Sequence, residues 1–289
     1  MLSQLYSYPL QVYNSNLCYL FLLLHHLSPL FVPNLYFHLY TIIINRTIKM
    51  ADNTPIFHHL NNSQSQRIFW LLEELSIPYT LQIHTRNPAT DPKAPFLAPP
   101  SLQATGPYGK APVLQTGPKD GNRYVPESLA IATYLIRTFD TADAFGLRDG
   151  DWVRDEILTS INLTSLGQAV NFMLMLDFNA IANGVGPIGK RFDGPAVRKV
   201  LGDLERELKE GPEGGFFLGQ HPGRADIMLE FPVALIRQRK WVDLEKEFPA
   251  LNAWLDKCYE RPAWKRSIEK GNGYDLSTFP QLEHLQYQA

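Results

Sequence analysis

The chain has 289 residues, of which 45% are apolar, so it can hold one large domain or two ordinary ones, each with a hydrophobic core. Its net charge is −2 and it contains no lysine- or arginine-rich run, which argues against nucleic acid as a partner. The two cysteines, Cys18 and Cys258, are too few for a disulfide framework, a cysteine-rich zinc site or a CxxC redox pair, and they favour a reducing cytoplasm. The adjacent histidine pairs at 25–26 and 58–59 lack the spacing of metal ligands, so no metal site is predicted.

The first 49 residues differ in composition from the rest of the chain. They contain no Asp or Glu, and Arg46 and Lys49 are their only basic residues besides histidine. The apolar stretch at 17–24 has no basic segment before it, and histidines and prolines interrupt it afterwards, which argues against both a signal peptide and a membrane span. We therefore expect residues 1–49 to be an extension of the gene model upstream of Met50, disordered wherever it is made, and we expect no contact with a membrane.

After Met50 the pattern reads strand, polar turn, helix, strand. Residues 54–60 have the length and composition of a strand, and from Gln66 apolar residues recur at helical spacing until Pro78 ends the helix. Residues 79–85 alternate as a second strand, which should lie parallel to the first because a helix connects them.

Residues 86–108 are rich in proline, with room for one short helix at 100–104. A hairpin follows, with strands at 111–116 and 123–126 joined by the turn-forming sequence GPKDGN, and a helix then runs over 127–139. These elements form a small α/β module of the order βαβ-ββα at 50–140, which a linker at 141–149 joins to the rest of the chain.

Beyond the linker the pattern is helical, with no convincing strand. Helices are predicted at 150–181, 189–210, 224–239 and 248–260. The chain therefore continues as an all-α domain at 150–265, followed by a tail at 266–289.

Glu127 and Ser128 lie where the hairpin ends and the helix begins. The first N–H groups of a helix have no partner inside it, so this position attracts a carboxylate. Ser128 can hold an α-carboxylate while Glu127 binds an α-ammonium, a combination that recognises the amino-acid end of a small ligand. Simple helix capping is the alternative, and the dipeptide alone favours it.

Pro112 lies at the start of a predicted strand, one of the few strand positions that proline tolerates. If the Ala111–Pro112 bond is cis, the backbone of Ala111 faces outward and can pair with an extended peptide. A trans proline in a loop is the commoner case, since only about 5–6% of X–Pro bonds in folded proteins are cis.

Four segments, in their order and spacing, resemble the glutathione S-transferase family and in particular its fungal cytosolic members. They are NNSQSQRIFWLLEEL (61–75), LAPPSLQATGPYGKAPVL (97–114), PESLAIATYL (126–135) and GRADIML (223–229). The resemblance runs from about Ile56 to Trp264. It implies an α/β thioredoxin-like N-terminal module followed by an all-α helical C-terminal domain.

The resemblance also implies how glutathione would bind. Its γ-glutamyl end would lie on Glu127 and Ser128, its cysteinyl backbone would pair with Ala111 beside a cis Pro112, and Lys110 would reach its glycyl carboxylate. Similar fungal sequences often have a histidine where this chain has Gly106, so the contacts to the glycyl end should differ here.

The thiol of glutathione would point at the turn before the first helix. Ser63 is the residue that the resemblance places against the thiolate, with Asn62 and then Ser65 as alternates. Ser65 is otherwise expected to cap the helix.

Two further predictions concern the helical domain. Phe172, Met173 and Met175 are flexible apolar side chains that would suit a pocket for a hydrophobic electrophile, although the same spacing is common in a helix core. In GRADIML, Gly223 and Asp226 form the N-cap of a helix, where Asp226 reaches back to free backbone N–H groups and serves folding.

The function that the resemblance implies is conjugation of the glutathione thiolate to small hydrophobic electrophiles, a detoxification reaction, by a cytoplasmic homodimer that needs no metal. A glutathione-dependent peroxidase or isomerase uses the same thiolate and is the first alternative. The second alternative is a non-catalytic binding or interaction module of the same fold.

Overall fold

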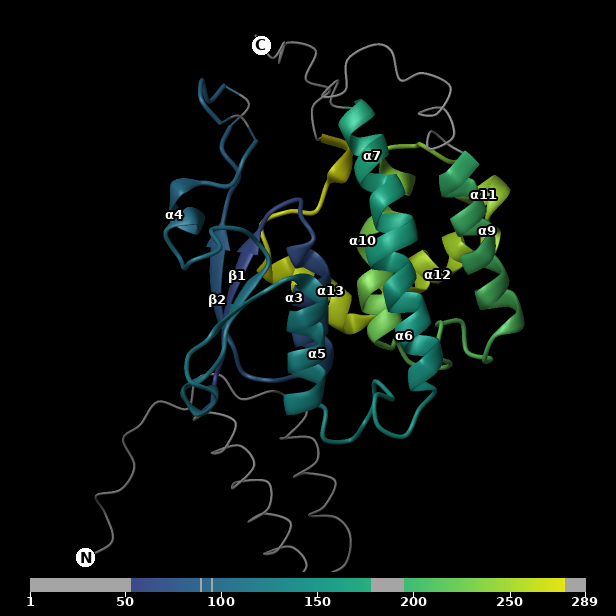
Figure 1. Ribbon diagram of the computed structural model, residues 1–289, viewed down its shortest axis with the longest axis horizontal. Coiled ribbons are helices and arrows are strands. Elements are labelled where there is room, and N and C mark those ends of the chain that lie inside the picture. The colour runs from purple at the N-terminus through teal and green to yellow at the C-terminus, as the bar shows by residue number, and fades with distance from the viewer. Residues whose placement is uncertain (1–52, 89, 95, 178–194, 279–289) are drawn as a thin grey trace, which may run out of the picture. The chain divides into compact units, whose positions relative to one another are not determined.

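The computed structural model describes residues 53–88, 90–94, 96–177 and 195–278 (Figure 1). The predicted extension at 1–49 and the end of the tail lie outside the described residues. So do residues 178–181 and 189–194 of two predicted helices. No helix in the described ranges is both long and apolar enough to cross a bilayer.

The described residues form a four-stranded sheet of order β2-β1-β3-β4. Strands β1 (Ile56–Leu60) and β2 (Thr80–His84) are parallel, and helix α3 (Ser65–Leu75) connects them, which confirms the predicted βαβ unit. Strands β3 (Val113–Gln115) and β4 (Tyr124–Pro126) form the predicted antiparallel hairpin, and β3 is also antiparallel to β1. A short 3-10 turn, Pro118–Asp120, lies in the hairpin loop.

Helices cover both faces of this sheet (Figure 1). Helix α3 lies on one face together with α5 (Ser128–Phe139), and the short helix α4 (Pro100–Gln103) lies on the other. Side chains of β1 alternate accordingly: the His59 ring is 5.1 Å from Phe69 of α3, whereas His58 stacks on His84 of β2 at 5.5 Å on the α4 side.

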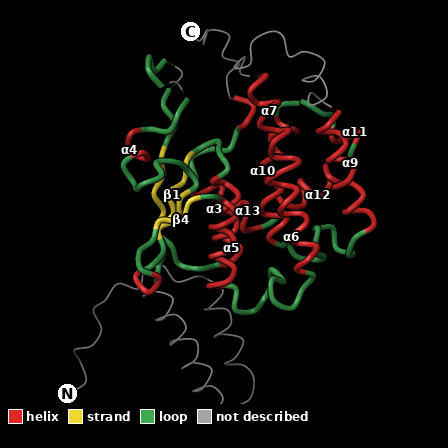
Figure 2. Tube along the Cα trace, viewed as in Figure 1, coloured by secondary structure: helices red, strands yellow, loops and turns green. Residues whose placement is uncertain are grey.

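The second domain consists of helices (Figure 2). In chain order they are α6 (Trp152–Ile161), a π-helical turn (Asn162–Leu166), α7 (Gly167–Asp177), α9 (Pro195–Glu210), α10 (Arg224–Gln238), α11 (Leu244–Glu247), α12 (Pro249–Glu260), α13 (Pro262–Lys270) and a 3-10 turn (Leu276–Thr278). The predicted helix at 150–181 is thus interrupted by a π-helical turn within its described part. A side chain at Gly167 would place its Cβ 2.4 Å from the Asn162 carbonyl oxygen, so the turn requires glycine there.

Helix α3 joins the two domains because it is buried on several sides at once. Its Arg67 donates a hydrogen bond to the Met228 carbonyl of α10 at 2.7 Å, and its Trp70 meets Trp264 of α13 edge to face at 5.7 Å. Helix α13 is absent from the predictions. Its short sequence, with few apolar positions, becomes helical on packing against α3, where Arg266 pairs with Glu73 at 2.9 Å.

Candidate functional site

Three strand ends meet at one edge of the sheet. His58 of β1 pairs with Val113 of β3, and Val113 pairs with Pro126 of β4, so the end of β1, the start of β3 and the end of β4 are neighbours. Helices α3 and α5 begin at this same edge, directly after β1 and β4. Two helix N-termini therefore bring partial positive charge to one place, an arrangement that favours anions. The first N–H groups of α5 have no partner inside their helix, whereas the Ser65 N–H of α3 is bound by the Ser63 hydroxyl.

The middle of this edge carries the predicted proline turn. The Ala111–Pro112 bond is cis, as the resemblance implied. Beside it, Ser128 is buried as the first residue of α5, while Glu127 lies just before the helix with φ +66° and its side chain is largely exposed. The structure therefore brings together the backbone turn and the two polar residues that the sequence singled out.

Lys110 and Glu127 form an ion pair. Lys110 Nζ lies 2.6 Å from Glu127 Oε1, and 55% and 69% of the two side chains are exposed. Lys110 therefore lies beside Glu127 in this structure, and its contact with the glycyl carboxylate of glutathione stays a prediction.

The structure shows why this chain has Gly106 where similar fungal sequences often have a histidine. A Cβ built on Gly106 would lie 2.9 Å from Cδ1 of the Tyr124 ring, closer than real side chains approach. Tyr124, from the start of β4, occupies the space that a side chain at position 106 would need.

The turn between β1 and α3, residues 61–64, is called the β1–α3 turn below. At its centre Ser63 is 6% exposed, and its hydroxyl lies 2.8 Å from the Leu60 carbonyl oxygen, to which it donates. The same hydroxyl accepts the Ser65 N–H at 3.1 Å. Ser63 therefore makes the side-chain bond to the start of α3.

The prediction that Ser65 caps the helix is consequently wrong. Ser65 is the first residue of α3 and is fully buried, and its hydroxyl accepts the Leu60 N–H at 3.0 Å and lies 2.9 Å from His59 Nδ1. Ser63 and Ser65 are both small hydroxyl residues, two positions apart, so only the path of the backbone decides which of them turns toward the helix.

Asn62 is tied to the end of the described chain. Residues 271–278, called the C-terminal strap below, run from α13 back to the β1–α3 turn. Asn62 N donates to the Gly273 carbonyl at 3.2 Å, and Asn62 Oδ1 accepts the Asp275 N–H at 2.8 Å. Asn62 has φ +47°, a conformation that asparagine adopts more readily than most residues.

Arg86, just after β2, holds the other side of the turn. Its guanidinium donates to the carbonyl oxygens of Asn61 at 3.2 Å, Asn62 at 3.3 Å and Phe96 at 2.9 Å. Burial lowers the pKa of Arg86 to about 10, which leaves it charged at neutral pH. The sequence carries no local signal for this role, since Arg86 lies in a proline-rich loop.

A buried polar cluster lies beneath the turn where the two domains meet. Glu230 of α10 is fully buried and accepts hydrogen bonds from Tyr274 of the strap at 2.9 Å and from Tyr259 at 3.1 Å. Burial raises the pKa of Glu230 to about 7, against the opposing effect of the two tyrosine hydroxyls and of the Arg67 charge. Burial likewise lowers the pKa of Arg67 to about 10.

The residues predicted for an electrophile pocket do not share one surface. Met173 is 7% exposed and belongs to the apolar core, whereas Met175 is 50% exposed, and Phe172 is intermediate. Core packing, the alternative reading of this stretch, therefore holds for Met173.

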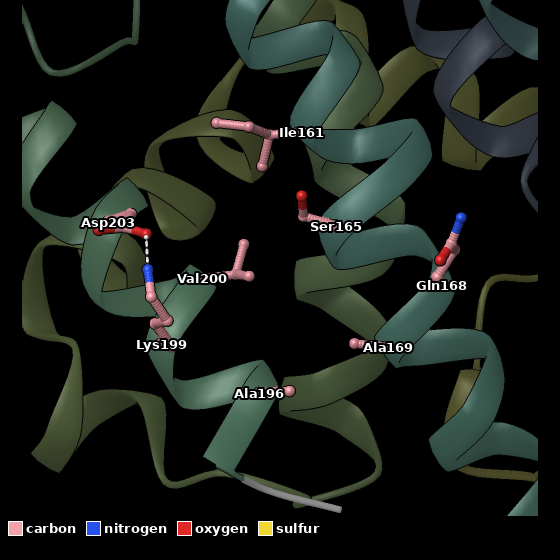
Figure 3. Close-up of a pocket in the computed structure, with 8 residues that line it drawn as sticks. All are labelled: Ile161, Ser165, Gln168, Ala169, Ala196, Lys199, Val200 and Asp203. Carbon is pink, nitrogen blue, oxygen red and sulfur yellow. Dashed lines mark hydrogen bonds and ion pairs between the residues drawn. The ribbon is translucent and has the colours of Figure 1, made fainter. Parts of the chain in front are cut away.

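A cavity of about 370 Å³ does lie in the helical domain, between the α6 to α7 segment and α9 (Figure 3). Its wall is formed by Ile161, Ser165, Gln168 and Ala169 on one side and by Ala196, Lys199, Val200 and Asp203 on the other. Lys199 and Asp203, four residues apart on α9, form an ion pair at 3.1 Å along one wall of the cavity (Figure 3). No residue predicted from the sequence lines it.

Asp226 makes the reach-back bond that its motif predicts. Asp226 Oδ2 accepts the Gly223 N–H at 2.8 Å, and Oδ1 accepts from Phe217 N at 3.0 Å and Trp254 Nε1 at 2.7 Å. The carboxylate is fully buried and far along the chain from the sheet edge. Its contacts are those of a residue that holds the start of α10 in place.

No group of three or more metal-ligating side chains is found within the described residues. What the edge offers is backbone N–H groups, hydroxyls, one exposed carboxylate and one exposed ammonium. These groups suit a zwitterionic peptide-like ligand.

A thioredoxin-like sheet followed by a helical domain, with a cis proline and two helix N-termini at one edge, defines a class of two-domain proteins. Comparison with family models gives the particular family. The model of the glutathione S-transferase N-terminal domain matches residues 63–138, and that of the C-terminal domain matches residues 193–262. The chain belongs to the glutathione S-transferase family, as its resemblance predicted.

Relatives and solved structures agree with this assignment. The chain is 25% identical over 243 residues to glutathione S-transferase 3 of Schizosaccharomyces pombe, covering 80% of this chain and 94% of the relative. It is 26% identical over 230 residues to glutathione S-transferase 1 of Saccharomyces cerevisiae, covering 74% and 93%. Among solved structures, a glutathione S-transferase from Actinobacillus pleuropneumoniae has a TM-score of 0.65 and 28% identity, covering 79% of this chain and 98% of that one.

The fold is also shared with a more distant structure. The glutathione transferase URE2P8 from Phanerochaete chrysosporium, solved with oxidized glutathione, has a TM-score of 0.57 and 23% identity, covering 75% of this chain and 94% of that one.

Proposed function

We propose that this protein is a glutathione transferase that conjugates glutathione to small hydrophobic electrophiles. The observation that carries the proposal is the sheet edge where the cis Pro112 turn, Ser128 and the N-termini of α3 and α5 come together. The family membership supports the same conclusion, and so does the oxidized glutathione held by the Phanerochaete chrysosporium protein of the same fold.

In this proposal glutathione lies along the edge. Its γ-glutamyl carboxylate binds Ser128 at the start of α5, its α-ammonium binds Glu127, and its cysteinyl backbone pairs with Ala111. The exposed Lys110–Glu127 ion pair opens to admit the ligand, at a cost of about 0–1 kcal/mol for a surface pair. Lys110 is then released to reach a carboxylate of the ligand.

The thiol of glutathione points at the β1–α3 turn, where Ser63 donates a hydrogen bond to the thiolate. A free thiol has a pKa of about 8.5, and lowering it by two units requires about 2.7 kcal/mol in favour of the anion. A hydrogen bond to a charged group supplies about 1.5–3 kcal/mol and a helix N-terminus about 0.3–1 kcal/mol. One hydroxyl and the start of α3 together are sufficient. Asn62 is the alternate donor, and Ser65 is the third because it is fully buried.

The reaction needs no protein base. The bound thiol loses its proton to solvent, and the sulfur lone pair forms a bond to an electrophilic carbon. In a substitution the leaving group departs with the electron pair of its bond. In an addition the double bond of the electrophile breaks, and its displaced π-electron pair takes up a proton from solvent. The protein contributes a lowered thiol pKa and the proximity of the two reactants.

One observation favours a second function. The Ser63 hydroxyl is already engaged with Leu60 O and Ser65, so a thiol must compete for its hydrogen. A chain in which that hydrogen never turns outward would bind glutathione without activating it, as a binding module.

The exposed face of α6 supports a homodimer. Trp152, Val153 and Ile157 are 61%, 49% and 56% exposed, an apolar stripe that a second copy of the chain would cover. We expect Ile157→Glu to shift the sedimentation coefficient of the full chain from dimer to monomer. A dimer unchanged by this variant would place the interface elsewhere.

The decisive experiment is an ultraviolet difference spectrum of glutathione bound to the full chain, recorded across pH. A thiolate band at neutral pH that Ser63→Ala abolishes supports the transferase, and conjugation of a chromogenic aryl halide should fall in parallel. Glutathione binding by calorimetry without a thiolate band supports the binding module. Absence of both binding and band refutes the two proposals.

A further inference from the structure

His59 is a buried histidine beneath the β1–α3 turn that the proposed chemistry does not use. It is fully buried, between the rings of Phe57 at 6.1 Å and Phe69 at 5.1 Å. Its Nδ1 lies 2.9 Å from Ser65 Oγ. Its Nε2 has no hydrogen-bond partner within the described part of the chain.

From His59 a chain of hydrogen bonds runs to the residue that faces the thiol. Ser65 Oγ lies 2.8 Å from Ser63 Oγ. Both hydroxyls are also within reach of the Leu60 carbonyl oxygen, at 2.8 Å from Ser63 and 2.9 Å from Ser65. The Leu60 N–H donates to Ser65 Oγ at 3.0 Å. These two hydroxyls have one hydrogen each, so the number of donors in the cluster is limited.

The unpartnered Nε2 indicates which nitrogen of His59 carries the proton. A buried N–H without an acceptor is rarer and costlier than a buried lone pair without a donor. The hydrogen therefore belongs on Nδ1, where it is donated to Ser65 Oγ. Burial lowers the pKa of His59 to about 4, with a smaller contribution from His84, so the ring is neutral at pH 7 and this single hydrogen is the one it offers.

With Nδ1–H donating, both lone pairs of Ser65 Oγ are filled, one by His59 and one by Leu60 N–H. Ser63 then has no acceptor left on Ser65, and the Ser65 hydrogen satisfies the Leu60 carbonyl. The Ser63 hydroxyl can therefore turn its hydrogen away, and the Leu60 carbonyl oxygen still has a hydrogen-bond donor. With the proton on Nε2 instead, the Ser65 hydrogen would turn to His59, and the Leu60 carbonyl would hold the Ser63 hydrogen inward.

We propose that His59 is a positioning residue which, through Ser65, turns the Ser63 hydroxyl outward as a donor to the glutathione thiolate. The inference rests on the proposed function, because it assigns the thiol to Ser63. It adds a buried residue near the end of β1 that does not itself touch the ligand.

The test compares three variants of the full chain by the ultraviolet titration of bound glutathione. In His59→Phe the donor to Ser65 is lost, so Ser65 Oγ accepts the Ser63 hydrogen and the pKa of the bound thiol should rise by about one unit, with KM for glutathione within twofold of wild type. His59→Asn can place an amide N–H at the Nδ1 position and should restore the wild-type thiol pKa. His58→Asn is the matched control, because His58 faces α4 on the opposite side of the sheet and should leave the thiol pKa unchanged.

A second measurement does not depend on glutathione. Long-range ¹H–¹⁵N correlation of labelled protein at pH 7 should show His59, identified by its loss in His59→Asn, with the proton on Nδ1. A proton on Nε2 overturns the inference, as does a wild-type thiol pKa in folded His59→Phe. If wild-type protein shows no thiolate band, both the transferase proposal and the role of His59 are refuted. If the band is lost in Ser63→Ala but unchanged in His59→Phe, only the role of His59 is refuted.

Discussion

Lys110 Nζ and Glu127 Oε1 lie 2.6 Å apart, although the two residues are expected to bind opposite ends of the same ligand. Both side chains are more than half exposed, so water screens the pair and its contribution to stability is about 0–1 kcal/mol. The ion pair is therefore weak, and we expect a ligand that offers a better partner to each residue to separate it.

Replacement of Glu127 should therefore affect ligand binding far more than stability. We expect Glu127→Gln to raise KM for glutathione about tenfold, because a charged hydrogen bond to the α-ammonium becomes a neutral one. The midpoint of urea unfolding should stay close to that of wild type. Glu269→Gln, the same change on an exposed position of α13, is the control. An unchanged KM in Glu127→Gln would remove Glu127 from the ligand site.

Replacement of Asp226 should lower the stability of the protein and leave glutathione binding unchanged. The Asp226→Ala change leaves the N–H groups of Gly223, Phe217 and Trp254 without their buried acceptor, and we expect a loss of about 3 kcal/mol or more in the free energy of unfolding. Glutathione affinity per folded molecule, measured by calorimetry, should not change. Asp203→Ala removes an exposed ion-paired carboxylate instead and should cost no more than about 1 kcal/mol. A large loss of affinity in folded Asp226→Ala would contradict the structural role.

Glu230 should make stability fall as pH rises toward neutrality. Its folded-state pKa of about 7 exceeds the value of 4.5 expected in the unfolded chain, so the folded state holds a proton that the unfolded state has lost. Its contribution is complete below pH 4.5 and is lost as pH rises through about 7, at up to about 1.4 kcal/mol per pH unit.

Urea unfolding of wild type and Glu230→Gln from pH 5 to 8 isolates this contribution. The quantity to compare is the difference in the free energy of unfolding between the two proteins. Buried histidines such as His59, whose pKa is lowered, make stability rise with pH below pH 6.5 in both proteins, which would mask the effect of Glu230 in wild type alone. We expect the wild-type curve to fall relative to that of Glu230→Gln over this range. Parallel curves would show that Glu230 has the same pKa in both states.

The close approach of Tyr124 to Gly106 predicts that Gly106→Ala destabilises the protein only while the Tyr124 ring is present. Gly106→Ala should destabilise the protein by about 1–3 kcal/mol, because its Cβ would lie 2.9 Å from the Tyr124 ring. In a Tyr124→Ala background the same change should be neutral or stabilising by about 0.4–1 kcal/mol, since alanine restricts the unfolded chain more than glycine does. Urea unfolding of the four proteins in this cycle measures the coupling. An equal effect of Gly106→Ala in both backgrounds would exclude the ring as the cause.

The parts of the fold that the sequence predicts correctly are those bounded by residues that end helices or form turns. Pro78 ends α3, the GPKDGN turn closes the hairpin, and each predicted strand lies within a few residues of its observed position. Helix α13 carries no such signal. Its stability comes from contacts such as Trp264 against Trp70, nearly 200 residues away in the chain, which no local window contains.

The site divides in the same way. The cis Pro112 and the place of Ser128 beside it are predicted from the family resemblance, because the residues alone favour a trans proline and a simple helix cap. The roles of Ser63 and Ser65 at the start of α3 could not be predicted, since either hydroxyl can reach a helix N-terminus and the backbone of the turn decides between them. That backbone is fixed by Arg86 and by the C-terminal strap, two distant segments.

The strap also sets when the site can be completed during synthesis. Asp275 is 213 residues downstream of Asn62, whose side chain accepts its N–H. At about 5–20 residues per second, the ribosome adds Asp275 roughly 10–40 s after Asn62. Through that interval the nascent sheet and α3 carry a β1–α3 turn without its strap. A nascent chain stalled before the strap should therefore hold a folded thioredoxin-like domain whose β1–α3 turn still lacks its hydrogen bonds to the strap. Nearly the whole polypeptide must be made before those bonds can form.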